Sequence, residues 1–226
     1  MKHIYENINN HTVCSTLLTL NNWVLDLGCN GFDFSYLLLQ RGMKVIGVDP
    51  MQNISIPDVV GENPNFHFIN SACTGIKREK QVYYEYMGWG ANSIYNTPEN
   101  LRRPEHLGHA ENAFKSSYLV DITTIQELMD QFKISQFDCI KMDVEGAEYE
   151  ILDNLPPKCT KQISIEFHDF LSLNPMGENI EEYHRQLEDV VLKDYCMVVQ
   201  DTSPYKGIND GRLQRDDVLY VLKDLL

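Results

Sequence analysis

The chain has 226 residues, of which 43% are hydrophobic and 23% are charged, a composition typical of a soluble globular protein. Its 19 basic and 33 acidic residues give a formal net charge of −14, which repels phosphate backbones and argues against a nucleic-acid substrate. The length predicts a single domain over residues 1–226 with a substantial core.

The cysteines and the N-terminus indicate where the protein works. The six cysteines are scattered, form no CxxC pair and are expected to be reduced core residues. The first ten residues, MKHIYENINN, lack the apolar core of a signal peptide, and no run approaches the roughly 18 apolar residues of a membrane span. We therefore expect a cytoplasmic protein without a membrane span, and the sequence predicts no oligomeric state.

The first third of the chain predicts the start of a parallel α/β sheet. Residues 11–20, HTVCSTLLTL, indicate a short helix, so residues 1–22 are expected to form a helical lead-in. Apolar runs bounded by turn residues then predict strands, with one helix after the first of them. These elements are the strand Trp23–Leu27, the helix Phe34–Gln40, and the strands Lys44–Val48 and Phe66–Ile69.

Residues 77–115 are expected to form a hairpin and a lid-like loop. Lys80–Tyr86 and Asn92–Tyr95 read as the hairpin, and residues 96–115 are polar, with two prolines. A loop of that length is usually a functional lid or disordered. Four of its side chains suit a polar substrate: Arg102, Arg103, His106 and His109.

The second half continues the alternation and ends differently. The expected elements are a helix capped by Thr123 or Thr124 and ending at Phe132, the strand Phe137–Met142, the helix Ala147–Leu155, the strand Gln162–Phe167, the helix Glu181–Lys193, and the strands Tyr195–Gln200 and Val218–Leu222. No helix separates the last two strands, which therefore predict an antiparallel hairpin at the edge of the sheet.

The most informative motif is IKMDVEGAE, residues 140–148. Lys141, Asp143 and Glu145 recur with a period of two, so an extended chain would point all three to one face. Because unpaired buried charges are costly, this predicts a polar site at the carboxyl end of the strand. The alternative is that only Lys141 lies in the strand, while Asp143 and Glu145 cap the following helix.

A second pair of polar residues repeats that pattern. Glu166 and His168 lie in IEFH, and neighbouring strands would bring them to the same edge as Lys141, Asp143 and Glu145. Groups so close together should perturb one another's pKa values, as in many functional sites.

The first strand-to-helix turn predicts a nucleotide site. Gly28 and Gly31 allow a tight turn, and Asp49 ends the next strand at about the distance from Asp26 at which a carboxylate reaches a ribose. Asn30 replaces the second glycine of the dinucleotide fingerprint, and an acid before the glycines suits an amine better than a pyrophosphate. S-adenosylmethionine fits this pattern. Alternatively, Asp26 caps the helix and Asp49 starts a turn before Pro50.

Methyl transfer to a hydroxyl needs a base or a metal near the oxygen. His168 could be the base, since imidazole titrates near neutrality. Alternatively, Asp143, Glu145, Glu166 and His168 could bind Mg²⁺ or Mn²⁺, which would acidify the hydroxyl.

Several segments resemble the FkbM-type methyltransferases in order and spacing: VLDLGCNGFDFS, VIGVDP, FINSA, FDCIKMDVEGAEYEIL and ISIEFH, within residues 23–170. The resemblance implies a class I, Rossmann-like fold, dependent on S-adenosylmethionine. Its sheet would be mostly parallel and seven-stranded, with an antiparallel last strand and helices on both faces. It also implies O-methylation, commonly of sugars in glycans or natural products.

The resemblance assigns roles by position. Asp26, Gly28, Asn30 and Ser35 would hold the methionine end of the cofactor, beside Gly31. Asp49 would bind the ribose, and Ser71 and Ala72 would lie beside the adenine. Asp143, Glu145, Glu166 and His168 would form the acceptor side, with Lys141 next to them.

Two positions depart from the family pattern. Phe32 stands where the family usually has its second glycine, so the turn is expected to be rebuilt. Gln126 replaces an aspartate and can supply hydrogen bonds but no charge.

Three other functions compete with saccharide O-methylation: methylation of a non-sugar hydroxyl, a nicotinamide-dependent oxidoreductase, and a binding module without chemistry. The missing glycine and the antiparallel tail count against the oxidoreductase, and the cluster of acids with His168 counts against the binding module. A small-molecule or glycan acceptor is the expected partner.

Overall fold

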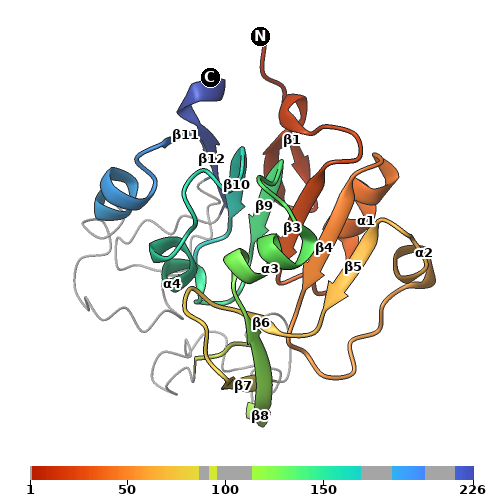
Figure 1. Cartoon of the computed structure of the whole chain (residues 1–226). Coiled ribbons are helices and arrows are strands. Elements are labelled where there is room, and N and C mark those ends of the chain that lie inside the picture. Colours follow the sequence, from red (N-terminus) through yellow and green to blue (C-terminus); the bar gives the residue numbers. More distant parts are fainter. Residues whose placement is uncertain (1, 87–91, 96–113, 169–184, 202–216) are drawn as a thin grey trace.

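A seven-stranded sheet forms the centre of the molecule (Figure 1). The computed structural model describes residues 2–86, 92–95, 114–168, 185–201 and 217–226. The strands lie in the order β11-β12-β10-β9-β3-β4-β5. Their bounds are β3 Trp23–Leu27, β4 Lys44–Val48, β5 Phe66–Ile69, β9 Cys139–Met142, β10 Gln162–Ile165, β11 Tyr195–Asp201 and β12 Asp217–Leu222.

The topology confirms the predicted class I methyltransferase fold. The strands from β5 to β10 are parallel, and β12 is antiparallel to both β10 and β11. Three predicted strands, β3, β4 and β5, have the bounds expected from their apolar runs. The last two strands form the expected antiparallel hairpin at the edge.

Helices cover both faces of the sheet. The helices are α1 Asp33–Gln40, α2 Asp58–Gly61, α3 Ile125–Phe132 and α4 Glu148–Asp153, with a π-helical segment η4 at Leu187–Val191. Leu25 and Leu27 pack in one core cluster with α3 and α4, whereas Val24 packs in a second cluster with α1. This alternation along β3 is the period-two pattern of a strand that is buried on both faces.

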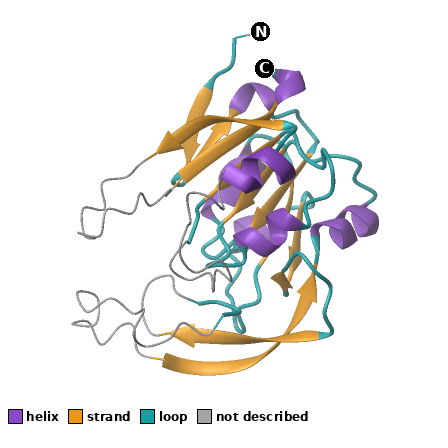
Figure 2. Ribbon diagram, turned by 90° about the vertical axis from the view of Figure 1, so that its left-hand side faces the viewer, coloured by secondary structure: helices purple, strands orange, loops and turns teal. Residues whose placement is uncertain are grey.

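A smaller sheet extends from the main body, at the end opposite both termini (Figures 1 and 2). Its strands are β6 Ala72–Cys73, β7 Lys80–Tyr86 and β8 Phe114–Thr123, in the order β6-β8-β7. The expected partner of β7, residues 92–95, contributes an antiparallel bridge between Tyr84 and Ser93, whereas β8 pairs with β7 over residues 80–86. Residues 114–115 belong to β8, and the rest of the predicted lid, with Arg102, Arg103, His106 and His109, lies outside the described residues.

The prediction of a helical lead-in was wrong. The N-terminal segment forms a β-hairpin, β1 Tyr5–Ile8 and β2 His11–Cys14, followed by the short 3₁₀ helix η1 Ser15–Leu17. Asn9 and Asn10 connect the strands with φ values of 47° and 66°. Asparagine tolerates this left-handed conformation, and two such residues make a tight hairpin turn.

Several predicted helices have shifted bounds. The first helix begins at Asp33, and α4 is shorter than expected at both ends. Thr124 caps α3 through a capping box with Glu127. The predicted helix 181–193 is described only from residue 185, where two helical residues lead into η4.

Among the helices described here, none is long and apolar enough to span a membrane.

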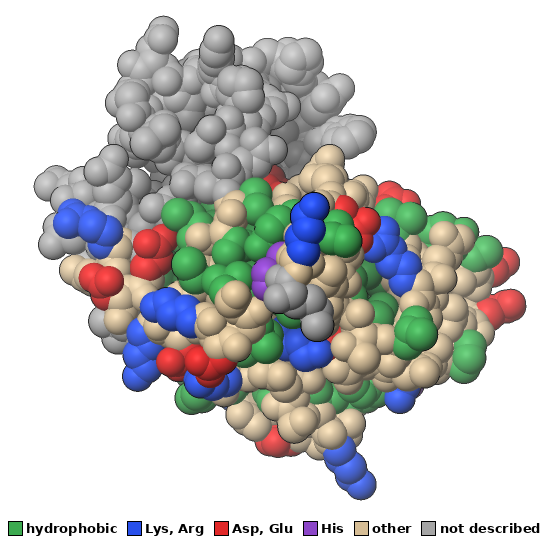
Figure 3. All heavy atoms as spheres, turned by 90° about the horizontal axis from the view of Figure 1, so that it is seen from above, with side chains coloured by type: hydrophobic (Ala, Val, Ile, Leu, Met, Phe, Trp, Pro, Cys, Tyr) green, Lys and Arg blue, Asp and Glu red, His purple; other side chains and the backbone are tan. Residues whose placement is uncertain are grey.

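The face that carries both termini shows acidic and basic side chains interspersed among apolar ones rather than gathered by sign (Figure 3).

Candidate active site

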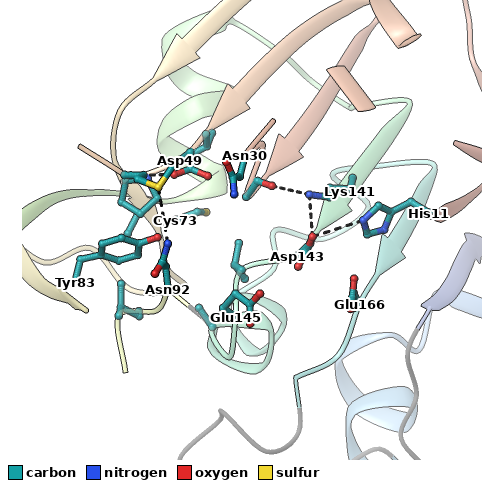
Figure 4. Close-up of a pocket in the computed structure, with 18 of the residues that line it drawn as sticks. His11, Asn30, Asp49, Cys73, Tyr83, Asn92, Lys141, Asp143, Glu145 and Glu166 are labelled. Atoms are coloured by element: carbon teal, nitrogen blue, oxygen red, sulfur yellow. Dashed lines mark hydrogen bonds and ion pairs between the residues drawn. The ribbon is translucent and has the colours of Figure 1, made fainter. Parts of the chain in front are cut away.

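A cavity of about 320 Å³ lies at the carboxyl edge of the parallel strands (Figure 4). Three groups of side chains line it. One group follows β3 and β4, a second comes from the smaller sheet, and a third comes from β9, β10 and the N-terminal hairpin. The polar or functional members are Gly28, Asn30 and Asp49; Ala72, Cys73, Tyr83 and Asn92; and Asn9, Asn10, His11, Lys141, Asp143, Glu145 and Glu166.

Asp49 marks one end of the cavity. It is buried, and its Oδ1 accepts a hydrogen bond of 2.9 Å from the backbone N–H of Met51. Burial raises the pKa of Asp49 to about 6, against hydrogen bonds that lower it. Asp49 therefore does start a turn before Pro50, as the alternative interpretation predicted. The side chain nevertheless lines the cavity.

Asp26 and Ser35 lie behind the cavity wall. Asp26 is fully buried, and its Oδ2 accepts a 2.6 Å hydrogen bond from Ser35 Oγ. Its Oδ1 lies 3.4 Å from the Lys141 ammonium nitrogen. Asp26 does not cap α1, since the N-cap residue is Phe32. The two residues predicted to touch the cofactor thus support the residues that line the cavity.

Gly28 is required by packing. A Cβ atom at Gly28 would lie 1.8 Å from the backbone oxygen of Asp143, and the residue has a φ of +72°. The turn after β3 and the segment after β9 therefore touch backbone to backbone. This contact joins the two ends of the cavity.

The rebuilt turn before α1 places Phe32 in a conformation that favours glycine. Phe32 has a φ of +62°, next to Gly31 at +80°. The phenyl ring is buried and packs edge-on against Phe66 and Phe68. Burial of the ring offsets the backbone strain, which costs about 1–2 kcal/mol. Gly31 does not line the cavity.

Of the two residues expected beside the adenine, one lines the cavity and the other does not. Ala72 lines the cavity together with Cys73. Ser71 is buried outside the lining, and its hydroxyl has no hydrogen-bond partner within the described part of the chain. Gln126 is exposed and donates to Asp130 rather than to the cavity.

Asp143 is the centre of the other end of the cavity. Its Oδ2 lies 3.4 Å from Lys141 Nζ and 3.8 Å from His11 Nε2, and its Oδ1 lies 3.8 Å from His168 Nε2. Burial would raise the pKa of Asp143, but Lys141 and the two imidazoles outweigh it and hold the pKa below its usual range. Asp143 therefore stays ionised.

Lys141 is the buried cation of this end. Its ammonium donates to the backbone oxygens of Gly28 at 2.7 Å and Leu27 at 3.3 Å. Burial alone would lower its pKa, but Asp143 and Asp26 raise it above the ordinary value. Lys141 thus stays charged and ties β9 to the turn after β3.

Glu145 enters the cavity from a turn and not from the strand. β9 ends at Met142, and Glu145 has a φ of +53° before Gly146 at +104°. Its backbone oxygen accepts a 2.5 Å hydrogen bond from Ser93 Oγ. The expected extended backbone through Glu145 is therefore wrong, because the strand ends at Met142. Burial raises the pKa of Glu145 to about 8 even though His168 lowers it.

His168 and Glu148 form a buried pair. His168 Nδ1 donates to Glu148 Oε1 at 2.8 Å, and the Glu148 carboxylate also accepts from the backbone N–H groups of Val144 and Gly146. Burial lowers the pKa of His168, but Glu145, Glu148 and Asp143 raise it well above 6.5. Glu148, which is fully buried, was not predicted as a site residue, although it ends the IKMDVEGAE motif.

Contrary to the alternative interpretation, Asp143 and Glu145 do not cap α4. The N-cap residue of α4 is Ala147, and it makes no side-chain cap. The loop amides that Asp143 or Glu145 were expected to satisfy are bonded by Glu148 instead.

The acids and histidines form two overlapping groups of potential metal ligands. One is Asp143, Glu145 and His168, and the other is His11, Asp143 and Glu166, each with its ligand atoms within 4.8 Å of one another. Glu166 Oε1 also lies 3.8 Å from His168 Nε2. Burial raises the pKa of Glu166, helped by the charge of Asp143. The sequence predicted four of these five residues and missed His11.

Comparisons with known proteins show a matching family model and solved structures of low identity. The family model described as "Methyltransferase FkbM domain" matches residues 27–191, and no curated protein matches the chain. Solved structures include a TehB-like SAM-dependent methyltransferase from Corynebacterium glutamicum (12% identity, 92% of this chain and 84% of that one, TM-score 0.42). Another is 1,6-didemethyltoxoflavin-N1-methyltransferase from Burkholderia thailandensis (10% identity, 90% and 71%, TM-score 0.42).

Proposed function

The chain belongs to the FkbM methyltransferase family. We propose that it transfers the methyl group of S-adenosylmethionine to a hydroxyl, and that this hydroxyl belongs to a saccharide. Membership of the family decides between methyl transfer and hydride transfer in favour of methyl transfer. The oxygen acceptor and the saccharide are our proposal.

One observation carries this proposal. A single cavity joins Asp49 at one end to Asp143, Glu145 and Glu166 at the other. A nucleoside bound through Asp49 would thus share a space with carboxylates that can accept the proton of a hydroxyl. Four asparagines also line the cavity, Asn9, Asn10, Asn30 and Asn92, and amides can both donate to and accept from a polyol.

The cofactor end would be held by residues of β3, β4 and β6. Asp49 would accept hydrogen bonds from the ribose hydroxyls, Ala72 would lie beside the base, and Asn30 would face the methionine end. Asp26, Gly28, Gly31, Ser35 and Ser71 support these contacts from behind. S-adenosylmethionine supplies the methyl carbon, and the chain orients the acceptor oxygen in line with it.

A carboxylate suits the base role better than His168. The pKa of His168 lies well above neutrality, so the imidazolium donates hydrogen bonds at neutral pH. Glu145, whose pKa is raised to about 8, is largely protonated at neutral pH and can accept a proton only at higher pH. Burial also raises the pKa of Glu166, which makes this carboxylate a better base once it is ionised. We therefore propose Glu166 as the base, and Glu145 above pH 8, with His168 orienting both.

A divalent cation is the second way to activate the hydroxyl. His168 Nε2 lies 3.4 Å from Glu145 and 3.8 Å from Asp143 and Glu166, and its Nδ1 is bonded to a carboxylate. Metal-bound histidines usually have such a carboxylate partner. Mg²⁺ or Mn²⁺ would lower the pKa of a bound hydroxyl at this position. EDTA treatment followed by addition of Mg²⁺ or Mn²⁺ separates this route from a carboxylate base.

The proposal is tested by methyl transfer from isotopically labelled S-adenosylmethionine. We expect label in methyl glycosides of neutral hexoses or deoxyhexoses, as an ether that resists alkali. Catechol, simple amines and carboxylic acids serve as the comparison set. Label found only in amines, or in esters that alkali hydrolyses, would contradict methylation of a hydroxyl, and label only in catechol would contradict the saccharide.

A further inference from the structure

The N-terminal hairpin reaches the reactive end of the cavity from outside the matched family domain. The family model begins at residue 27, whereas Asn9, Asn10 and His11 belong to the hairpin and line the cavity. Nothing in the family match therefore accounts for these three side chains.

The hairpin is fixed to the main sheet by buried hydrogen bonds. The backbone N–H and the hydroxyl of Thr12 both donate to Asp217 Oδ2, at 2.9 and 2.7 Å. Gln162 accepts from the Cys14 N–H and donates to the Cys14 backbone oxygen. These bonds tie β2 to β10 and β12, so the residue between the turn and Thr12 has a defined position.

His11 occupies that position. The residue is only 3% exposed, and its ring packs edge-on against Phe34 with 5.8 Å between centroids. Nε2 faces Asp143, and Nδ1 has no hydrogen-bond partner within the described part of the chain. A buried imidazole with so few polar contacts costs about 1–3 kcal/mol unless a ligand completes them.

The surroundings of His11 favour a neutral ligand over a cation. Lys141 lies 3.4 Å from the same Asp143 oxygen that faces His11, so its ammonium would repel a metal ion placed there. A hydroxyl oxygen carries no charge. With 3.8 Å between Nε2 and Oδ2, one oxygen can lie at a hydrogen-bond distance of about 2.8 Å from both.

We propose that His11 binds the acceptor hydroxyl together with Asp143, and that the N-terminal hairpin is thus part of the acceptor site. This inference rests on the proposed O-methyltransferase function. Asn9 and Asn10 at the tip of the hairpin offer amides to the neighbouring hydroxyls of a polyol. The hairpin then contributes to the choice of acceptor, and the matched domain holds the cofactor.

Two substitutions separate hydrogen bonding from packing. His11→Gln keeps a polar nitrogen or oxygen near Nε2 but loses the ring, whereas His11→Phe keeps a ring against Phe34 but loses the polar atoms. His3→Phe is the matched control, because His3 precedes the same hairpin and does not line the cavity. The probe is the methyl glycoside that the wild-type protein methylates, or the catechol control if only that is methylated.

We expect the acceptor KM to rise about 10- to 100-fold in His11→Phe and less in His11→Gln, with the Kd for S-adenosylmethionine unchanged in both. His3→Phe should match the wild type. A better acceptor KM in His11→Phe than in His11→Gln would show that the ring only packs, and would overturn the inference. If the protein methylates catechol but no saccharide, and the acceptor KM values of the variants still follow the expected order, the proposed saccharide acceptor would be overturned. The role of His11 in binding the acceptor hydroxyl would stand.

Discussion

The two ends of the cavity use the same residue types but differ in how far their polar groups are satisfied within the protein. At the end that we propose for the cofactor, Asp49 accepts a hydrogen bond from the Met51 amide, and Asp26 accepts one from Ser35. At the reactive end, Glu145 and Glu166 have raised pKa values, and the described contacts that these carboxylates make to His168 are 3.4 Å and 3.8 Å long. The carboxylates of the first end are thus held by short hydrogen bonds within the protein, whereas those of the second end make only longer contacts. Asp49, with a pKa of about 6, shares the raised pKa of the second end.

Substitution of Gly28 should break both ends at once. Gly28→Ala places a methyl group 1.8 Å from the Asp143 backbone oxygen, so we expect the free energy of unfolding to fall by at least about 4 kcal/mol. Gly31→Ala is the control, because its nearest contact would be 3.8 Å away and only its φ is unfavourable. Urea unfolding measures both. Equal losses would mean that backbone strain, and not the close approach, determines the role of Gly28.

Removing the charge of Asp143 should affect only the reactive end. Asp143→Asn is expected to lower kcat about 1,000-fold, since the groups around the acceptor lose their common partner. Calorimetry should find the Kd for S-adenosylmethionine within a few-fold of wild type. Asp121→Asn, an exposed surface substitution, controls for net charge. Loss of cofactor binding in Asp143→Asn would show that the two ends are not separable.

The pH dependence of stability should identify Glu145 as the strained acid. Its folded pKa of about 8 exceeds the ordinary value of 4.5, so the unfolded chain releases this proton first and stability falls as pH rises between these values. Glu145→Gln removes the effect and should stabilise the protein by about 4 kcal/mol at pH 8, with little change at pH 4.5. Melting curves across this range, with exposed Glu62→Gln as control, provide the test. A gain that does not grow with pH would contradict the raised pKa.

The smallest effect is expected at the cofactor end. Asp49→Asn keeps the side-chain oxygen that accepts from the Met51 N–H but loses the negative charge that would bind the ribose hydroxyls. The Kd for S-adenosylmethionine should therefore rise about 10-fold. The acceptor KM should not change, and exposed Asp58→Asn should bind like the wild type. An unchanged Kd in Asp49→Asn would assign Asp49 to the turn alone.

The sequence predicted the elements that depend on continuous patterns. Trp23–Leu27 and Lys44–Val48 are apolar runs that only a buried strand accommodates, and both strands end where the runs end. The hairpin was missed because HTVCSTLLTL also fits a short helix, and only the left-handed turn at Asn9 and Asn10 excludes it. Strand β8 was missed because its first residues closely follow a long polar segment.

The site residues that could be predicted are those whose ionisable side chains recur at every second position. Asp143, Glu145, Glu166 and His168 were found through their period of two, and they do come together. His11 and Glu148 belong to no such pattern, because their roles depend on contacts across the sheet. The orientation of Glu145 could not be predicted, since its left-handed backbone depends on the neighbouring Gly146 and Ser93.

Glu148 offers a spectroscopic view of this end of the cavity. Its carboxylate accepts the amide protons of Val144 and Gly146 as well as the bond from His168. A change in the charge of His168 alters the electron density on that carboxylate and hence the chemical shifts of the two amide protons. In an NMR spectrum, these two resonances would follow the protonation of the imidazole during titration without any change to the side chains.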